Sequence, residues 1–251
     1  MSESKPDTVP GLGFKDKEKA LETLKNLEGR DPDYQKLAVK GLVGRAKRTL
    51  TLTKDKEKLQ NINDAMAVFE DFLKKYELKN MSKENRSYLP IAHIDALIPL
   101  KEKFKIVSKE IDNFLEAYRN KAKGDYKNLR TVASGDDKPT WDIVRNTELK
   151  KLLKVMEEES PDLWKDDLPT KEHMELILWA YSPDATKIKK NVSAYESKLG
   201  TGKKDEDEDM EEEDEKEDKK KSKKDKGSKR KSSTSDSGSE DEGSPKKKSK
   251  E

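Results

Sequence analysis

Few residues in this chain are able to do chemistry, and their spacing favours no reaction. The 251 residues include no cysteine and two histidines, His93 and His173. A disulfide framework, a thiolate zinc site and a cysteine nucleophile are therefore excluded. Glu172 and Glu175 flank His173, but no second histidine lies at a helical offset that would complete a metal site. We expect both histidines to be helix-terminal or partly packed side chains.

Glycines and paired acids give equally weak indications of catalysis. Gly11-Leu12-Gly13 lacks the further glycine and lysine, and the preceding strand, of a phosphate-binding loop. Asp136-Asp137 and Asp166-Asp167 are neighbours in sequence, whereas general acid–base catalysis needs two carboxylates placed across a cleft. We therefore predict that the chain is not an enzyme, with no catalytic residue, no cofactor and no metal.

The tryptophans are concentrated in one region. Trp141, Trp164 and Trp179 all lie in the last third of the helical region, and Tyr181 follows closely. One interpretation is that the second half of the core is built around these rings. The alternative is an aromatic groove, formed by the same four residues, that takes a peptide or helix of a partner protein. The sequence leaves both open.

A set of basic residues marks one of the predicted helices. A solvated helical face is the ordinary explanation, and a face that contacts phosphates is the alternative. The five residues concerned are Lys36, Lys40, Arg45, Lys47 and Arg48.

The chain changes character at residue 200. From Gly200 on, Met210 is the only residue with a sizeable apolar side chain. Residues 205–218 contain twelve acids and one lysine, and residues 219–231 contain nine Lys/Arg and one aspartate. Such blocks cannot bury enough apolar surface to offset the entropy of ordering. We expect a flexible lead-in over residues 1–13, a helical domain over 14–199 and a disordered charged tail over 200–251.

The tail carries two kinds of regulatory pattern. Its basic clusters resemble a two-part and a one-part nuclear import signal, with solubility or nucleic-acid contact as alternatives. The import candidates are Lys219, Lys220, Lys221, Lys229, Arg230, Lys231, Lys246, Lys247, Lys248 and Lys250. Three serines have an acid three residues on and a fourth precedes proline, which suits acidophilic and proline-directed kinases. These phosphorylation candidates are Ser233, Ser237, Ser239 and Ser244.

Apolar residues at steps of three and four predict helices through the domain. One begins near Asp16, with Ala20, Leu21, Leu24 and Leu27 on its apolar side. Asp31-Pro32 predicts a capped start for a second, to about residue 50, in which Gly41 and Gly44 weaken the helix or allow a close helix contact. The third carries Leu59, Ile62, Met66, Phe69, Leu73 and Tyr76. A weaker segment interrupted by Pro90 and Pro99 follows.

The remaining elements are also predicted to be helical. A long helix should carry Phe104, Val107, Ile111, Phe114, Leu115 and Tyr118 and end at Gly124. Helices should then start at Thr140, at Pro169-Thr170 and at Ser182-Pro183-Asp184, the last of them reaching Leu199. No stretch alternates with period two, so we predict no strand. The expected fold is all-α, a compact bundle of about seven to eight helices, burying one modest core.

These observations favour a non-enzymatic nuclear adaptor. The helical domain would bind a protein partner, and the tail would bind an import receptor and supply phosphorylation-tuned electrostatics. The alternative is a nucleic-acid-associated protein of chromatin or ribosome biogenesis that uses the basic helix face and the tail. No apolar run is long enough to span a bilayer, so no membrane partner is expected.

Overall fold

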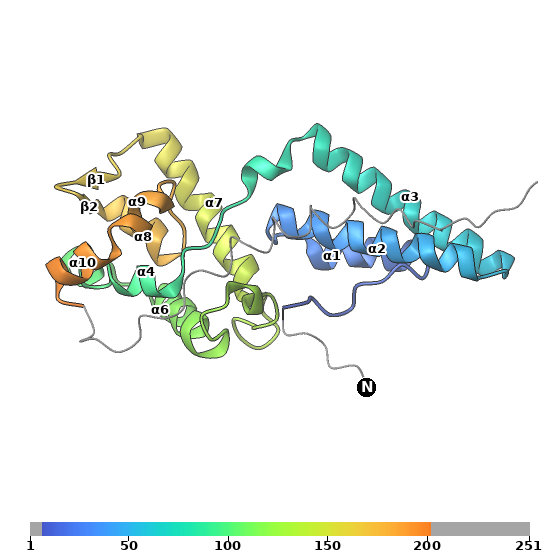
Figure 1. Cartoon of the computed structure of the whole chain (residues 1–251), viewed down its shortest axis with the longest axis horizontal. Coiled ribbons are helices and arrows are strands. Elements are labelled where there is room, and N and C mark those ends of the chain that lie inside the picture. The colour runs from blue at the N-terminus through green and yellow to red at the C-terminus, as the bar shows by residue number, and fades with distance from the viewer. Residues whose placement is uncertain (1–6, 202–251) are drawn as a thin grey trace, which may run out of the picture. The chain divides into compact units, whose positions relative to one another are not determined.

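The computed structural model describes residues 7–201, and these residues are mostly helical (Figure 1). The expected all-α class is confirmed for this part of the chain. Residues 1–6 and 202–251, which include nearly all of the predicted tail, lie outside the described residues, so the predicted domain boundaries stay predictions.

Ten α-helices, three short turns of other helix types and one small hairpin follow each other along the described residues. The elements are α1 (Lys17–Leu27), α2 (Pro32–Leu52), α3 (Lys56–Leu78), η1 (Met81–Glu84), α4 (Ile91–Asp95), α5 (Pro99–Lys103), α6 (Lys109–Glu116), η2 (Ala117–Lys121), η3 (Tyr126–Arg130), α7 (Trp141–Glu159), β1 (Trp164–Lys165), β2 (Leu168–Pro169), α8 (Lys171–Leu178), α9 (Ala185–Lys190) and α10 (Val192–Leu199).

The first three helices bury an apolar cluster of their own, because α1 and α2 both pack along α3 (Figure 1). We call it the N-terminal cluster; its buried members are Ala20, Leu27, Val39, Leu42, Ala65 and Phe69. The predicted third-helix stripe is correct at Ile62, Phe69 and Tyr76, which are all buried. The prediction that Leu21 lies on the buried side of the first helix is wrong, since this side chain is 52% exposed. Thr23 is buried instead and exchanges hydrogen bonds with the main chain of Gly13.

A second apolar cluster involves residues from Leu89 to Tyr195 and is built on Phe114, Trp141 and Trp179. We call it the C-terminal cluster. The expectation of a single core is therefore wrong. The two clusters stay separate because charged and polar side chains, described below, fill the space where α1 and α2 meet α7.

The predicted long helix over residues 104–118 is broken into pieces. Lys105 has a left-handed backbone conformation with φ of 53°, which ends α5, and Val107 is 92% exposed. A new start follows at Ser108, whose Oγ accepts the amide of Ile111. The predicted end near Gly124 is confirmed, since Gly124 has φ of +75° and its amide donates to the Tyr118 carbonyl.

Two further differences concern the C-terminal third. Trp164–Lys165 and Leu168–Pro169 pair as an antiparallel hairpin, where no strand was predicted. Asp166 and Asp167 both adopt left-handed conformations in its two-residue turn, which Asp tolerates better than most residues. The predicted last helix is interrupted at Asn191 and forms α9 and α10. These breaks explain why ten helices occur where seven or eight were expected.

Candidate functional site

The turn between α1 and α2 is joined to α7 by two crossed ion pairs. Arg30 donates through Nη1 to Asp142 Oδ2 at 2.7 Å, and both side chains are almost fully buried. Asp31, the next residue, lies 3.7 Å from Arg145 Nη1. Asp142 and Arg145 are three residues apart on α7 and so lie on one side of that helix. Adjacent residues of the turn thus pair with opposite charges on one helix face.

Arg145 is fully buried, and its five donors explain how the charge is tolerated. Its guanidinium donates to the main-chain carbonyls of Arg86, Ser87, Trp179 and Ala180. It also lies 3.7 Å from the ring centroid of Tyr88. A buried cation is stable only when it is paired and hydrogen-bonded in this way. Arg145 therefore ties residues 86–88 and the end of α8 to α7.

Asp31 does not cap α2, although its position before Pro32 predicted that role. Its side chain makes no hydrogen bond to the helix amides and instead accepts from Asn146 Nδ2 at 3.2 Å. Burial raises the pKa of the Asp31 carboxyl, and the positive charge of Arg145 opposes that rise. Asp31 interacts with Arg145 and not with the amides of α2, because its carboxylate is buried beside this cation.

Sequence reasoning missed Arg30, Asp142 and Arg145. One indication was present for Arg145: it lies four residues from both Trp141 and Leu149, on the apolar side of the predicted helix. An arginine on that stripe has to find internal acceptors. Nothing in the sequence identified those acceptors, which come from residues 86–87 and 179–180.

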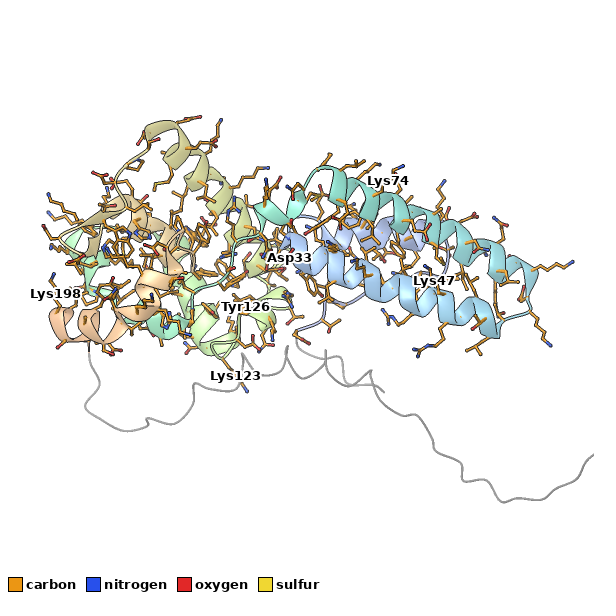
Figure 2. All side chains as sticks on the ribbon, turned by 45° about the horizontal axis from the view of Figure 1, so that its top comes forward. Asp33, Lys47, Lys74, Lys123, Tyr126 and Lys198 are labelled. Atoms are coloured by element: carbon orange, nitrogen blue, oxygen red, sulfur yellow. The ribbon has the colours of Figure 1, made fainter. Side chains whose placement is uncertain are left out.

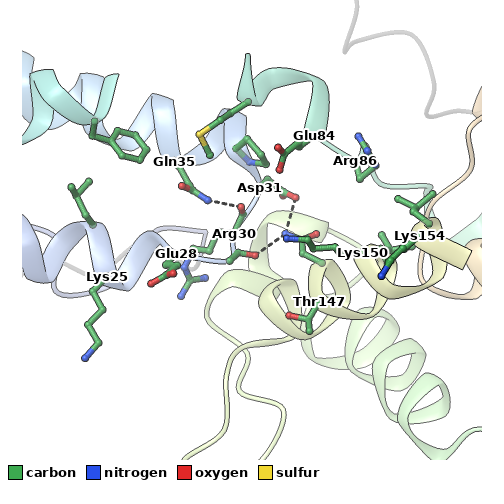
Figure 3. Close-up of a pocket in the computed structure, with 18 of the residues that line it drawn as sticks. Lys25, Glu28, Arg30, Asp31, Gln35, Glu84, Arg86, Thr147, Lys150 and Lys154 are labelled. Carbon is green, nitrogen blue, oxygen red and sulfur yellow. Dashed lines mark hydrogen bonds between the residues drawn. The ribbon is translucent and has the colours of Figure 1, made fainter. Parts of the chain in front are cut away.

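A groove of about 1140 Å³ opens beside this junction (Figure 3). We call it the junction groove. Its apolar wall includes Leu24 of α1, Phe72 of α3, Met81 of η1 and Leu153 of α7, all only half-buried. One end is closed by the turn of residues 28–31, which is held by hydrogen bonds from Asn146 to the Gly29 carbonyl and from Gln35 to the Arg30 carbonyl.

The charged residues around the junction groove are largely left without ion pairs. Lys150 and Lys154 come from α7, whereas Glu28 and Glu84 come from the end of α1 and from η1 (Figure 3). Within residues 7–201, only Lys154 of these four forms a salt bridge, a long contact of 3.8 Å to Glu158. The groove therefore combines apolar surface with unpaired charges of both signs.

The four aromatic residues predicted to form a partner groove do not line this one. Trp141 and Trp179 are each 4% exposed and pack on Phe114, so they belong to the core, the other interpretation left open by the sequence. Trp164 is half-buried, with its ring against His173 and beneath Lys187 Nζ. Tyr181 is half-buried with the Arg86 guanidinium 5.8 Å from its ring centroid. Among the described residues these rings do not gather into one groove.

The five basic residues of α2 lie on two different sides of the helix. Lys36, Lys40 and Lys47 share a side, by their spacing of four and seven, and Lys36 pairs with Glu77 of α3 at 2.7 Å. Arg45 and Arg48 face elsewhere and are exposed. The set is therefore not one phosphate-contacting face. The import and phosphorylation candidates of the tail lie outside the described residues.

His173 is fully buried and hydrogen-bonded at both ring nitrogens. Nδ1 lies 2.9 Å from the Leu163 carbonyl oxygen, which can only accept, so Nδ1 carries the proton. Nε2 lies 2.9 Å from Ser182 Oγ and accepts from it in the neutral ring. The same Ser182 oxygen accepts the amide of Asp184. Burial lowers the pKa of His173, and the contacts join the hairpin, α8 and the start of α9.

No protein-family model matches the chain, and a comparison with curated proteins finds no significant match. Within residues 7–201, no helix is long and apolar enough to cross a membrane.

Proposed function

We propose that this chain is a non-enzymatic nuclear adaptor whose helical domain binds a segment of a partner protein in the junction groove. The observation that supports the proposal is the groove itself. Half-buried apolar side chains are flanked by four charged groups, of which only Lys154 forms an ion pair within residues 7–201, and binding sites for protein segments have this composition.

The chemistry of the groove defines the occupant. It is an amphipathic helix whose apolar side chains cover Leu24, Phe72 and Leu153, and whose carboxylates face Lys150 and Lys154 on α7. Basic side chains on its other edge face Glu28 and Glu84. Charge complementarity of this kind fixes the orientation of a bound segment and excludes partners of the wrong pattern.

In this proposal the tail directs the protein to the nucleus. The basic clusters of residues 219–231 and 246–250 bind an import receptor, and phosphate on Ser244 or its neighbours weakens the contact of the last cluster by adding negative charge. Fusing residues 219–251 to a large inert reporter tests this part. Nuclear accumulation supports it and cytoplasmic retention contradicts it. Replacing Lys246–Lys248 with alanine should reduce accumulation less than replacing Lys219–Lys221 together with Lys229–Lys231.

The adaptor role is tested with two full-length variants that change charge equally. Lys150→Glu/Lys154→Glu alters the junction groove, and Lys189→Glu/Lys190→Glu alters exposed positions on α9. Proteins that bind the wild type and the α9 variant, but not the groove variant, are identified from nuclear extract. Their binding segments are then titrated as purified peptides.

The proposal expects a purified segment that binds the wild type and loses about tenfold in affinity, about 1.4 kcal/mol, with the groove variant alone. Equal capture of every protein by both variants would contradict it. Thermal unfolding of both variants checks that neither substitution disrupts the fold.

A further inference from the structure

Helix α2 contains two glycines that no neighbour requires. Gly41 and Gly44 lie in the middle of this 21-residue helix, where glycine disfavours the helical state. An ideal Cβ placed on either residue meets no heavy atom within 4 Å. The close helix contact that these glycines allow is therefore not made within the described chain. Their effect is to leave helix backbone bare at the surface.

A second groove, of about 930 Å³, lies against this side of α2. Tyr34, Leu37, Gly41 and Arg45 line it from α2, following steps of three and four. Tyr126, Lys127 and Arg130 line it from η3. Asp33, at the start of α2, and Tyr126 of η3 both line this groove and are labelled in Figure 2. Leu37 is 70% exposed, so the groove offers open apolar surface beside its cations.

The second groove is lined by charges of both signs. Asp31 is paired with Arg145, whereas Asp7 and Asp33 form no ion pair with any described residue, and Asp33 accepts a hydrogen bond from the Tyr76 hydroxyl at 2.9 Å. Arg45 and Lys127 are exposed and form no ion pair with any described residue. The lining carries four cations, Arg45, Arg86, Lys127 and Arg130, against the two acids Asp7 and Asp33 that have no ion pair within the described residues, so its net charge is positive.

Planar groups come from both walls of the second groove, since Tyr34 belongs to α2 and Tyr126 and Arg130 belong to η3. The Arg130 guanidinium lies 3.9 Å from the ring centroid of Tyr34, and Tyr126 stacks on Tyr88 with centroids 4.8 Å apart and planes at 20°. These contacts hold the rings and the guanidinium in fixed orientations. Ordered planar groups next to unpaired cations are what unstacked bases and their phosphates require.

We propose that the second groove binds a single-stranded polynucleotide. The phosphates contact Arg45 and Lys127 in the groove and then Arg48, an exposed residue of α2 three positions beyond Arg45. The sugar–phosphate chain approaches the bare backbone at Gly41, and a base packs on Tyr126 or Leu37. The planar side chains favour a single strand, whose unstacked bases are free to pack on them, over a duplex, whose bases are already paired and stacked. An acidic protein segment would use the cations but not the planar groups. This surface is separate from the junction groove, and the inference does not depend on the adaptor role.

The test uses the full-length chain and a fluorescent oligouridylate of about 20 nucleotides, a length that covers one binding groove. The first variant, Arg45→Ala/Arg48→Ala/Lys127→Ala, removes two cations that line the groove and a third, Arg48, that lies beyond it on α2. The control, Lys36→Ala/Lys40→Ala/Lys47→Ala, removes three cations from the other side of the same helix. Any contribution of the basic tail is equal in both.

The groove variant should lose about tenfold in affinity, and its plot of log K against log salt should become shallower by about 2, because each phosphate contact on a single strand contributes about 0.7. The control should lose less than about threefold. Gly41→Leu should raise the melting temperature and still weaken binding, since it blocks the groove without disturbing the fold.

Equal losses in the two triple variants, or no binding by the wild type, would overturn the proposal. Preferential binding of a fluorescent oligoglutamate, with the same dependence on Arg45, would also overturn it and assign the groove to an acidic protein segment.

Discussion

Arg30 and Asp142 form a buried salt bridge at 2.7 Å although 112 positions separate them in the sequence. The contact joins the turn between α1 and α2 to the first turn of α7. It lies where the N-terminal cluster gives way to the C-terminal cluster, so it fixes how the wall of the junction groove is assembled.

Removing either partner of this pair should destabilise the chain strongly. Arg30→Met leaves the Asp142 carboxylate buried without a cation, and a change of this type costs about 3–5 kcal/mol in free energy of unfolding. Asp142→Leu should have a comparable cost. The double variant should lose much less stability than the sum of the losses of the two single variants, because no unpaired charge remains. Denaturant unfolding of all four proteins measures the coupling, and strictly additive costs would show that the pair is not coupled.

The N-terminal cluster gives a direct test of core packing. Phe69 is fully buried, so Phe69→Ala should lower the free energy of unfolding by about 3–5 kcal/mol. Leu37 is 70% exposed, so Leu37→Ala is the matched control and should change it by less than about 0.5 kcal/mol. Denaturant titration followed by circular dichroism measures both values. A loss below about 1 kcal/mol for Phe69→Ala would contradict the described packing of α3.

Much of this fold follows from residue spacing, because an apolar residue every three or four positions is buried only by a helix packed on its neighbours. Phe69 and Tyr76 were predicted as core for that reason. The break at Lys105 was missed because a left-handed lysine is not indicated by residue type. The role of Asp31 was missed because a local capping rule could not anticipate Arg145, which is 114 positions away.

The candidate site was less predictable than the fold. The junction groove is assembled from α1, α3, η1 and α7, so its existence depends on contacts between distant segments. Large aromatic rings are common both in cores and in binding surfaces, so the sequence could not separate the two roles. Trp141 and Trp179 are buried in the core. The split of the basic residues of α2 follows from helix geometry and could have been found by placing Lys36 and Arg45 on a helical wheel.

The glycines of α2 should be unfavourable for stability. Because an added methyl group meets no atom within 4 Å, Gly41→Ala and Gly44→Ala should each raise the free energy of unfolding by about 0.5–1 kcal/mol. Gly29→Ala is the contrasting control. Gly29 has φ of +77°, and an added Cβ would lie 3.1 Å from Ile143 Cγ2, so this change should destabilise. Thermal and denaturant unfolding distinguish a gain in stability from a loss. A loss of stability in Gly41→Ala would contradict the open space found beside Gly41.

His173 should make stability depend on pH in a defined direction. Burial lowers the folded-state pKa below the ordinary value of 6.5, with Asp184 and Lys187 acting in opposite directions. The unfolded chain therefore binds more protons than the folded chain as pH falls below 6.5, and stability should decrease there. In His173→Gln this part of the pH dependence should disappear. Denaturant midpoints measured at a series of pH values test it, and identical slopes for the two proteins would contradict the neutral, buried assignment.

Site-specific photo-crosslinking tests the central claim, the binding of a partner segment in the junction groove, most directly. A benzophenone amino acid replaces Thr147, an exposed residue that lines the groove, and in a second protein it replaces Thr51, an exposed residue near the end of α2 that does not line it. After irradiation in nuclear extract, the account predicts an adduct from position 147 that maps to an amphipathic, acid-bearing segment of one protein, is absent from position 51 and is lost in Lys150→Glu/Lys154→Glu. The same adducts from both positions, or none from position 147, would contradict it.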